Sequence, residues 1–304
     1  MHAEPLLTWS EPVTEFVGFV SLFLANGAIG FRFAALRRSG AAAGAEPIRL
    51  LAGTAAQRAA TLGLLGALVQ GALLVSRLPR LAERMHLTTS QLLTTDPQTI
   101  ARCVLLLLAV AGFTLGVARQ RSGWPLAAVG LIGSELAGVL SGDWTRLVNP
   151  VHQLLAGLWL GSLAVLVIAG IVPALRAAPT LRGDAVAEMV NGFSPLALVC
   201  GPLLIVTGVI TALRHLRPFS ALWSTPYGYD LIVKLCLVAM VFALGAWNWR
   251  RQRPRLGSEG AAGGILRSSL LELSVATMVL MVTAVLVSLP SPKPPPPAQP
   301  SSSA

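Results

Sequence analysis

The chain has 304 residues, of which 54% are hydrophobic and 12% are charged, and its mean hydropathy is +0.69. Because soluble domains carry about 25% charged residues, this composition argues against a cytosolic enzyme and predicts an all-α, polytopic transmembrane helical bundle. The formal net charge of +10 is therefore interpreted as a topology signal before it is taken as evidence for an acidic partner.

Apolar segments long enough to cross the membrane recur along the whole chain. A hydrocarbon core of about 30 Å takes about 20 helical residues, and the runs are too long for β-barrel strands of about 10 residues. The predicted spans are near 12–36, 55–77, 99–118, 124–141, 150–176, 192–214, 229–249 and 265–289.

The basic residues between these spans predict the orientation. Lys and Arg collect on the cytoplasmic side of membrane proteins. Thirteen fall on one predicted side and eight on the other, while Arg32 and Lys234 lie inside spans. This distribution favours both termini on the periplasmic side, although Arg77, Arg80 and Arg84 in the loop after the second span run against it.

The spans divide into two predicted membrane halves. Residues 1–149 form an N-terminal four-helix half, residues 150–289 a second four-helix half, and residues 290–304 a Pro/Ser-rich tail that is expected to be disordered. The sequences at 113–116 and 242–245 echo one another. A 4+4 internal repeat would explain the echo, and chance similarity between apolar helices is the alternative.

Ionisable residues inside spans are costly, and they usually face the bundle interior or a watery cavity. Here they are Glu15, Arg32, Glu135, Lys234 and Glu272. Glu135 and Lys234 lie at similar predicted depths and are expected to be able to pair. They are interpreted either as a structural ion pair or as a polar wall along an ion path.

The histidines all map to one predicted side of the membrane, as His2, His86, His152 and His215. Met85 adjoins His86, so a thioether and an imidazole stand together, and both groups are copper ligands.

Sulfur atoms form a second candidate metal set. Cys236 and Met240 share one helix face, as do Met278 and Met281. A ladder of these soft ligands would pass Cu(I) along the bundle, whereas the alternative is that the methionines fill gaps in the core. The chain has no CxxC, P-loop, GxGxxG or HExxH motif and no nucleic-acid module, so an enzyme is not predicted.

A series of short motifs in the second half occurs in a fixed order on four successive predicted spans. Together they resemble the CopD family of bacterial copper-resistance membrane proteins over about residues 150–290. The motifs are His152-Gln-Leu-Leu-Ala-Gly-Leu-Trp159-Leu-Gly161, Phe193-Ser194-Pro195, Thr207-Gly208, Thr225-Pro226-Tyr227-Gly228, Lys234, Asn248 and Leu266-Arg-Ser-Ser-Leu-Leu-Glu272.

The resemblance implies a multi-pass protein of the bacterial inner membrane that handles copper ions for homeostasis and resistance, with import favoured. It also implies a periplasmic copper carrier of the CopC type as partner. The positions that it singles out are His152, Trp159, Tyr227, Lys234 and Glu272, of which His152 is the natural copper ligand. Because no CopC-like domain and no Met- or His-rich run stands in this sequence, the carrier is expected to be a separate protein.

The sequence is also compatible with two other functions. A haem-binding membrane redox protein would use His152 and His215 as axial ligands. A copper-delivery factor for a respiratory oxidase would bind copper without transporting it.

Overall fold

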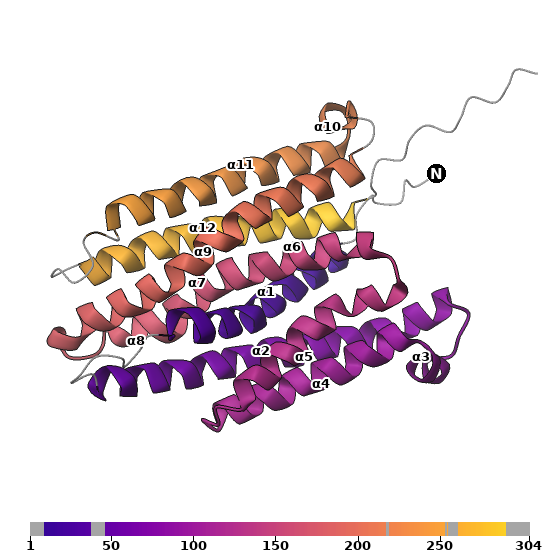
Figure 1. Cartoon of the computed structure of the whole chain (residues 1–304). Helices are drawn as coiled ribbons and strands as arrows, with labels where there is room; N and C mark the ends of the chain where they lie inside the picture. Colours follow the sequence, from indigo (N-terminus) through magenta and orange to yellow (C-terminus); the bar gives the residue numbers. More distant parts are fainter. Residues whose placement is uncertain (1–8, 38–45, 217–218, 253, 255–260, 290–304) are drawn as a thin grey trace, which may run out of the picture.

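The computed structural model describes residues 9–37, 46–216, 219–252, 254 and 261–289. All regular elements in these residues are helical (Figure 1). In chain order they are α1 Ser10–Gly30, η1 Phe31–Ala35, α2 Glu46–Arg84, α3 Thr89–Thr95, α4 Pro97–Val117, α5 Gly123–Leu136, η2 Ala137–Ser141, η3 Trp144–Leu147, α6 Val148–Ala156, η4 Gly157–Gly161, α7 Ser162–Val165, η5 Leu166–Ile171, α8 Val172–Ala174, α9 Pro179–His215, α10 Ala221–Ser224, α11 Pro226–Trp247, η6 Asn248–Gln252 and α12 Ala261–Ser288.

The predicted helical membrane bundle is confirmed, since the described residues contain eight helical stretches that are long and apolar enough to cross a membrane. Two helices are much longer than their predicted spans: α2 has 39 residues and α9 has 37. Hydropathy marks only the apolar window of such a helix and misses the polar turns at its ends. The tail at 290–304 and His2 lie outside the described residues.

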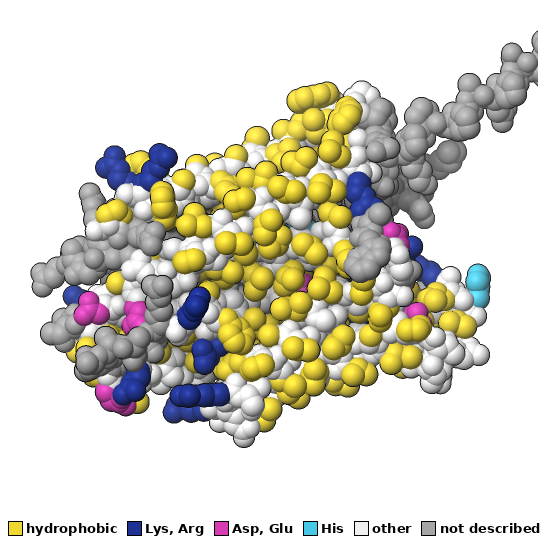
Figure 2. All heavy atoms as spheres, viewed as in Figure 1, with side chains coloured by type: hydrophobic (Ala, Val, Ile, Leu, Met, Phe, Trp, Pro, Cys, Tyr) yellow, Lys and Arg dark blue, Asp and Glu magenta, His cyan; other side chains and the backbone are white. Residues whose placement is uncertain are grey.

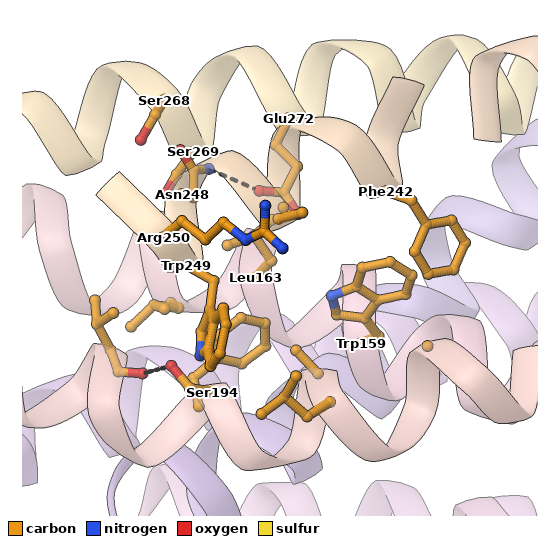
Figure 3. Close-up of a pocket in the computed structure, with 18 of the residues that line it drawn as sticks. Trp159, Leu163, Ser194, Phe242, Asn248, Trp249, Arg250, Ser268, Ser269 and Glu272 are labelled. Atoms are coloured by element: carbon orange, nitrogen blue, oxygen red, sulfur yellow. Dashed lines mark hydrogen bonds between the residues drawn. The ribbon is translucent and has the colours of Figure 1, made fainter. Parts of the chain in front are cut away.

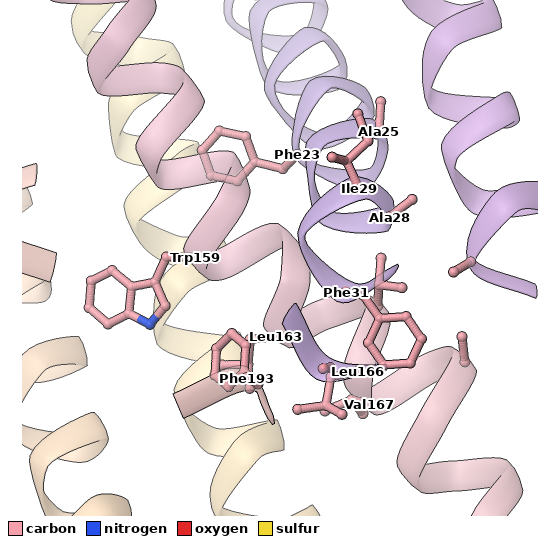
Figure 4. Close-up of a cluster of buried hydrophobic side chains, with 14 of the residues drawn as sticks. Phe23, Ala25, Ala28, Ile29, Phe31, Trp159, Leu163, Leu166, Val167 and Phe193 are labelled. Carbon is pink, nitrogen blue, oxygen red and sulfur yellow. The ribbon is translucent and has the colours of Figure 1, made fainter. Parts of the chain in front are cut away.

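Helix α1 lies in the middle of the bundle, between α2, α4 and α5 on one side and α9, α11 and α12 on the other (Figure 1). It contacts α2 in its own predicted half, and η4 and α12 in the other half. These contacts form one continuous core, and Figure 4 shows Phe23 of α1 and Phe31 of η1 beside Trp159 and Leu166 of the α6–α8 span. The two predicted halves thus share a core, and the 4+4 repeat stays a prediction.

The outer surface is apolar in the way that a lipid-facing surface requires. Figure 2 shows hydrophobic side chains across the middle of the bundle and charged side chains gathered toward its two ends. Large side chains such as Leu107, Val129 and Val199 are more than half exposed on it. This belt is the arrangement expected when every backbone polar group is satisfied within helices that face hydrocarbon.

The span Val148–Ala174 is interrupted by two π-helical segments, η4 and η5. Such segments carry an extra residue in a turn and are frequent at functional sites. Gly161 of η4 packs directly on α1: a Cβ built there would overlap the carbonyl oxygen of Phe23, and one on Gly27 would overlap the Gly161 backbone. Glycine at both positions therefore allows the two backbones to touch.

Candidate functional site

Two cavities in the C-terminal part of the bundle share one wall. The His152 cavity has a volume of about 120 Å³, and the Glu272 cavity has a volume of about 470 Å³. Trp159, Ile205 and Phe242 line both of them. The Trp159 and Phe242 rings lie 4.9 Å apart, centre to centre, at 47°. This aromatic pair therefore stands between a cavity that contains an imidazole and a cavity that contains a carboxylate.

His152 is held by a hydroxyl of the neighbouring helix α9. Its Nδ1 lies 2.9 Å from Thr207 Oγ1, and that hydroxyl lies 2.8 Å from the Leu203 carbonyl oxygen. A carbonyl oxygen only accepts, so the Thr207 proton goes to Leu203 and the hydroxyl oxygen accepts from Nδ1–H of His152. In the neutral ring this leaves the Nε2 lone pair free, which is the form in which histidine binds a metal.

Both residues of the Thr207-Gly208 motif lie beside the His152 ring. A Cβ on Gly208 would lie 3.3 Å from His152 Cε1, which is closer than ordinary van der Waals contact between carbon atoms. Gly208 makes room for the imidazole at the α9 surface, and Thr207 fixes its orientation.

Lys234 of α11 lines the same cavity as His152, together with Gln153 and Thr283. Asp230 lies one helical turn before Lys234, and the two charges attract one another. The remaining lining of the His152 cavity is largely apolar, so the Lys234 amino group and the imidazole share a weakly screened environment.

Glu272 of α12 is buried, and its Oε2 accepts a hydrogen bond from Asn248 Nδ2 at 3.0 Å. Figure 3 shows both side chains at the rim of the Glu272 cavity, with Ser268, Ser269 and Arg250 nearby. Hydroxyl, amide and carboxylate oxygens therefore face one space, at the end of the bundle where α11 ends and α12 begins (Figure 1).

Glu135 lies apart from Lys234 and Glu272, in the N-terminal half. Its Oε1 accepts from Asn26 Nδ2 at 2.7 Å, and it lines a cavity of the N-terminal half. The predicted Glu135–Lys234 pair is wrong. The Asn26 side-chain amide is the hydrogen-bond partner of the Glu135 carboxylate, and the ion pairs among the described residues do not include Lys234. Asn26 is fully buried; the sequence signal for it was one carboxamide in the apolar stretch 12–36, which our sequence reasoning missed.

Replacing Asn26 by leucine is expected to lower the free energy of unfolding by about 1–3 kcal/mol, the cost of leaving a buried polar group without its donor. Glu135 Oε2 already has no hydrogen-bond partner among the described residues, so the variant leaves the whole carboxylate unpaired. Thermal unfolding of the purified protein in detergent measures the loss. The double variant Asn26→Leu/Glu135→Leu is expected to recover part of it, and an unchanged midpoint in Asn26→Leu would refute the assignment.

Among the remaining predicted metal ligands, those whose side chains the structure describes line neither cavity. Met85 and His86 are exposed at the turn after α2, where His86 has a positive φ of 56°. His215 is the last residue of α9, and its side chain lies outside the described part of the chain.

The sulfur residues of α11 and α12 face outward. Met240, Met278 and Met281 are each about half exposed, and Cys236 is exposed as well. This placement gives no support for a sulfur path inside the bundle, because in a membrane these side chains contact lipid. Sequence spacing identified which residues share a helix face but not which neighbour that face meets.

The Thr225-Pro226-Tyr227-Gly228 motif starts helix α11. Thr225 Oγ1 accepts from the Gly228 backbone N–H at 3.1 Å, and Pro226 occupies the first turn, as expected at a helix N-terminus. Tyr227 packs on a small cluster that includes Leu216 and Leu286. The geometry gives this motif a structural role, and Tyr227 lines neither cavity.

Comparison with known proteins adds to this geometry. Residues 187–286 match the family model described as Copper resistance protein D, CopD. A copper transport protein of Bacillus subtilis (strain 168), CutJ, is 30% identical over 146 residues, which cover 48% of this chain and 25% of that protein. The chain thus matches about a quarter of its relative's length, and no solved structure matches it significantly. These matches confirm the predicted resemblance to the CopD family over residues 187–286 and support a copper-related membrane protein.

Proposed function

We propose that the chain moves copper across the bacterial inner membrane, in the import direction, and that both termini lie in the periplasm. The observation that carries this proposal is the pair of cavities divided by Trp159 and Phe242. One cavity offers a positioned imidazole nitrogen and the other a buried carboxylate. Lys234 and Glu272 lie within residues 187–286, which match the family described as Copper resistance protein D, whereas His152 and Trp159 precede them.

In the proposed path, a copper ion delivered by a separate carrier of the CopC type enters the His152 cavity and binds Nε2. Rearrangement of the Trp159–Phe242 pair then connects this cavity to the Glu272 cavity, where the carboxylate attracts the cation. Conduction needs binding that is strong enough to admit an ion and weak enough to release it. The positive charge of Lys234 opposes the cation in the His152 cavity and serves release.

Copper accumulation in cells tests the proposal. A bacterial host that expresses the protein is expected to gain cell-associated copper relative to the empty vector, measured by elemental mass spectrometry at equal expression. Glu272→Gln removes the negative charge but keeps the Asn248 contact and is expected to lower the gain about tenfold, since one unit charge in a partly screened site is worth at least 1.4 kcal/mol. Leu107→Phe, on the lipid-facing surface, is the matched control.

The same strains separate the alternative functions. Copper that is unchanged by expression, together with altered oxidase activity, would contradict transport and indicate a delivery factor. A Soret absorption band in the purified protein would indicate haem.

A further inference from the structure

A third cavity, of about 560 Å³, lies in the N-terminal half, between α1, α2, α4, α5 and the start of α6. We call it the arginine cavity, because three arginines of α2 and one of α4 line it: Arg77, Arg80, Arg84 and Arg102. Its other surface is largely leucine, contributed by Leu22, Leu73, Leu74, Leu81, Leu106 and Leu131. The cavity therefore combines a strongly basic side with an apolar side.

The basic side carries an excess of positive charge. Arg77 forms an ion pair with Glu15 at 2.7 Å, and the second acid of the cavity, Glu135, is engaged by Asn26. Arg80, Arg84 and Arg102 take part in none of the ion pairs found among the described residues. Four guanidinium groups thus face two carboxylates, which repels a metal cation and attracts an anion.

The position of these arginines in the membrane indicates which anion. The 39 residues of α2 extend for about 58 Å at 1.5 Å per residue, well beyond a hydrocarbon core of about 30 Å. Its last turns therefore reach headgroup depth, and Arg77, Arg80 and Arg84 share one helix face at spacings of three and four residues. These are the arginines that run against the topology bias of the sequence, so orientation does not explain them.

We propose that the arginine cavity binds the phosphate group of an anionic phospholipid, with the acyl chains along its leucine side. Guanidinium groups bind phosphate through two parallel hydrogen bonds, and basic pockets between membrane helices are suited to such headgroups. Free inorganic phosphate would satisfy the same arginines but would leave the leucine side uncovered.

Thermal unfolding of the delipidated 304-residue chain tests the site. Phosphatidylglycerol is expected to raise the midpoint by about 4 °C, as a ligand present well above its Kd would. Phosphatidylcholine and millimolar inorganic phosphate are expected to raise it by less than half as much. The variant Arg80→Gln/Arg84→Gln/Arg102→Gln is expected to lose the shift, whereas Arg176→Gln/Arg182→Gln/Arg267→Gln, which removes three exposed arginines at the other end of the bundle, is expected to keep it.

The outcomes separate the possible sources. An equal shift with inorganic phosphate would overturn the lipid assignment, and an equal phosphatidylglycerol shift in both triple variants would overturn the site. Arg84→Gln alone, at the exposed end of α2, repeats the test with a smaller disturbance and is expected to lose part of the shift. Native mass spectrometry is expected to show bound phosphatidylglycerol on the wild type and the control but not on Arg80→Gln/Arg84→Gln/Arg102→Gln.

Discussion

Replacing His152 by alanine is expected to lower copper binding by the purified protein, and copper accumulation by cells, at least tenfold. In the proposed function the imidazole is the copper ligand of the His152 cavity, because its hydrogen bond to Thr207 through Nδ1 leaves Nε2 free. X-ray absorption on copper-loaded protein is expected to show nitrogen ligation in the wild type and to lose it in His152→Ala.

Thr207 provides a graded form of the same test. Thr207→Val removes the hydroxyl that accepts from His152 Nδ1. We expect it to weaken copper binding about tenfold, as the loss of a residue that orients a metal ligand does. Thr207→Ser retains the hydroxyl and is expected to retain the copper affinity. His86→Ala, on the exposed turn after α2, is the matched control and is expected to bind copper normally. Wild-type affinity in His152→Ala, or a larger loss in His86→Ala, would remove His152 from the mechanism.

The second large effect is expected from the glycine contact between α1 and η4. Gly161→Ala or Gly27→Ala places a methyl group into the backbone of the facing helix, which cannot rotate away as a side chain would. The two helices must move apart to accommodate the methyl group. We therefore expect the free energy of unfolding to fall by about 1–3 kcal/mol. The measurement is the unfolding midpoint in detergent together with the yield of monodisperse protein.

Gly53→Ala is the control for this prediction. Gly53 lies in α2, and a Cβ there meets nothing within 4 Å, so alanine is expected to be neutral or to stabilise by about 0.4–1 kcal/mol. If Gly161→Ala unfolds at the same temperature as Gly53→Ala, the close approach of α1 and η4 does not exist.

Hydropathy alone predicted the eight spans, because a membrane helix must be apolar over about 20 consecutive residues and such a run is visible in the sequence without knowledge of its neighbours. It could not predict how the helices pack. Helix α1 contacts η4 and α12, more than a hundred residues away, through glycines whose role depends on the neighbour that they meet. The π-helical turn around Trp159 likewise has no simple signal in the composition.

The same distinction applies to the candidate site. His152, Trp159, Lys234 and Glu272 were predicted from their motifs, and the structure places all four on the two cavities. Their partners Thr207 and Asn248 stood in those motifs without an assigned role. The sulfur residues were grouped correctly by helix face, but helical spacing does not say whether a face meets protein or lipid, and these faces are exposed.

Copper flux into proteoliposomes tests the central claim most directly. Purified protein reconstituted with an entrapped copper-sensitive dye is expected to give a copper-dependent signal above that of protein-free liposomes. His152→Ala is expected to reduce the initial rate at least tenfold, while His86→Ala retains it. A wild-type rate equal to that of protein-free liposomes, with copper still bound to the protein, would contradict transport.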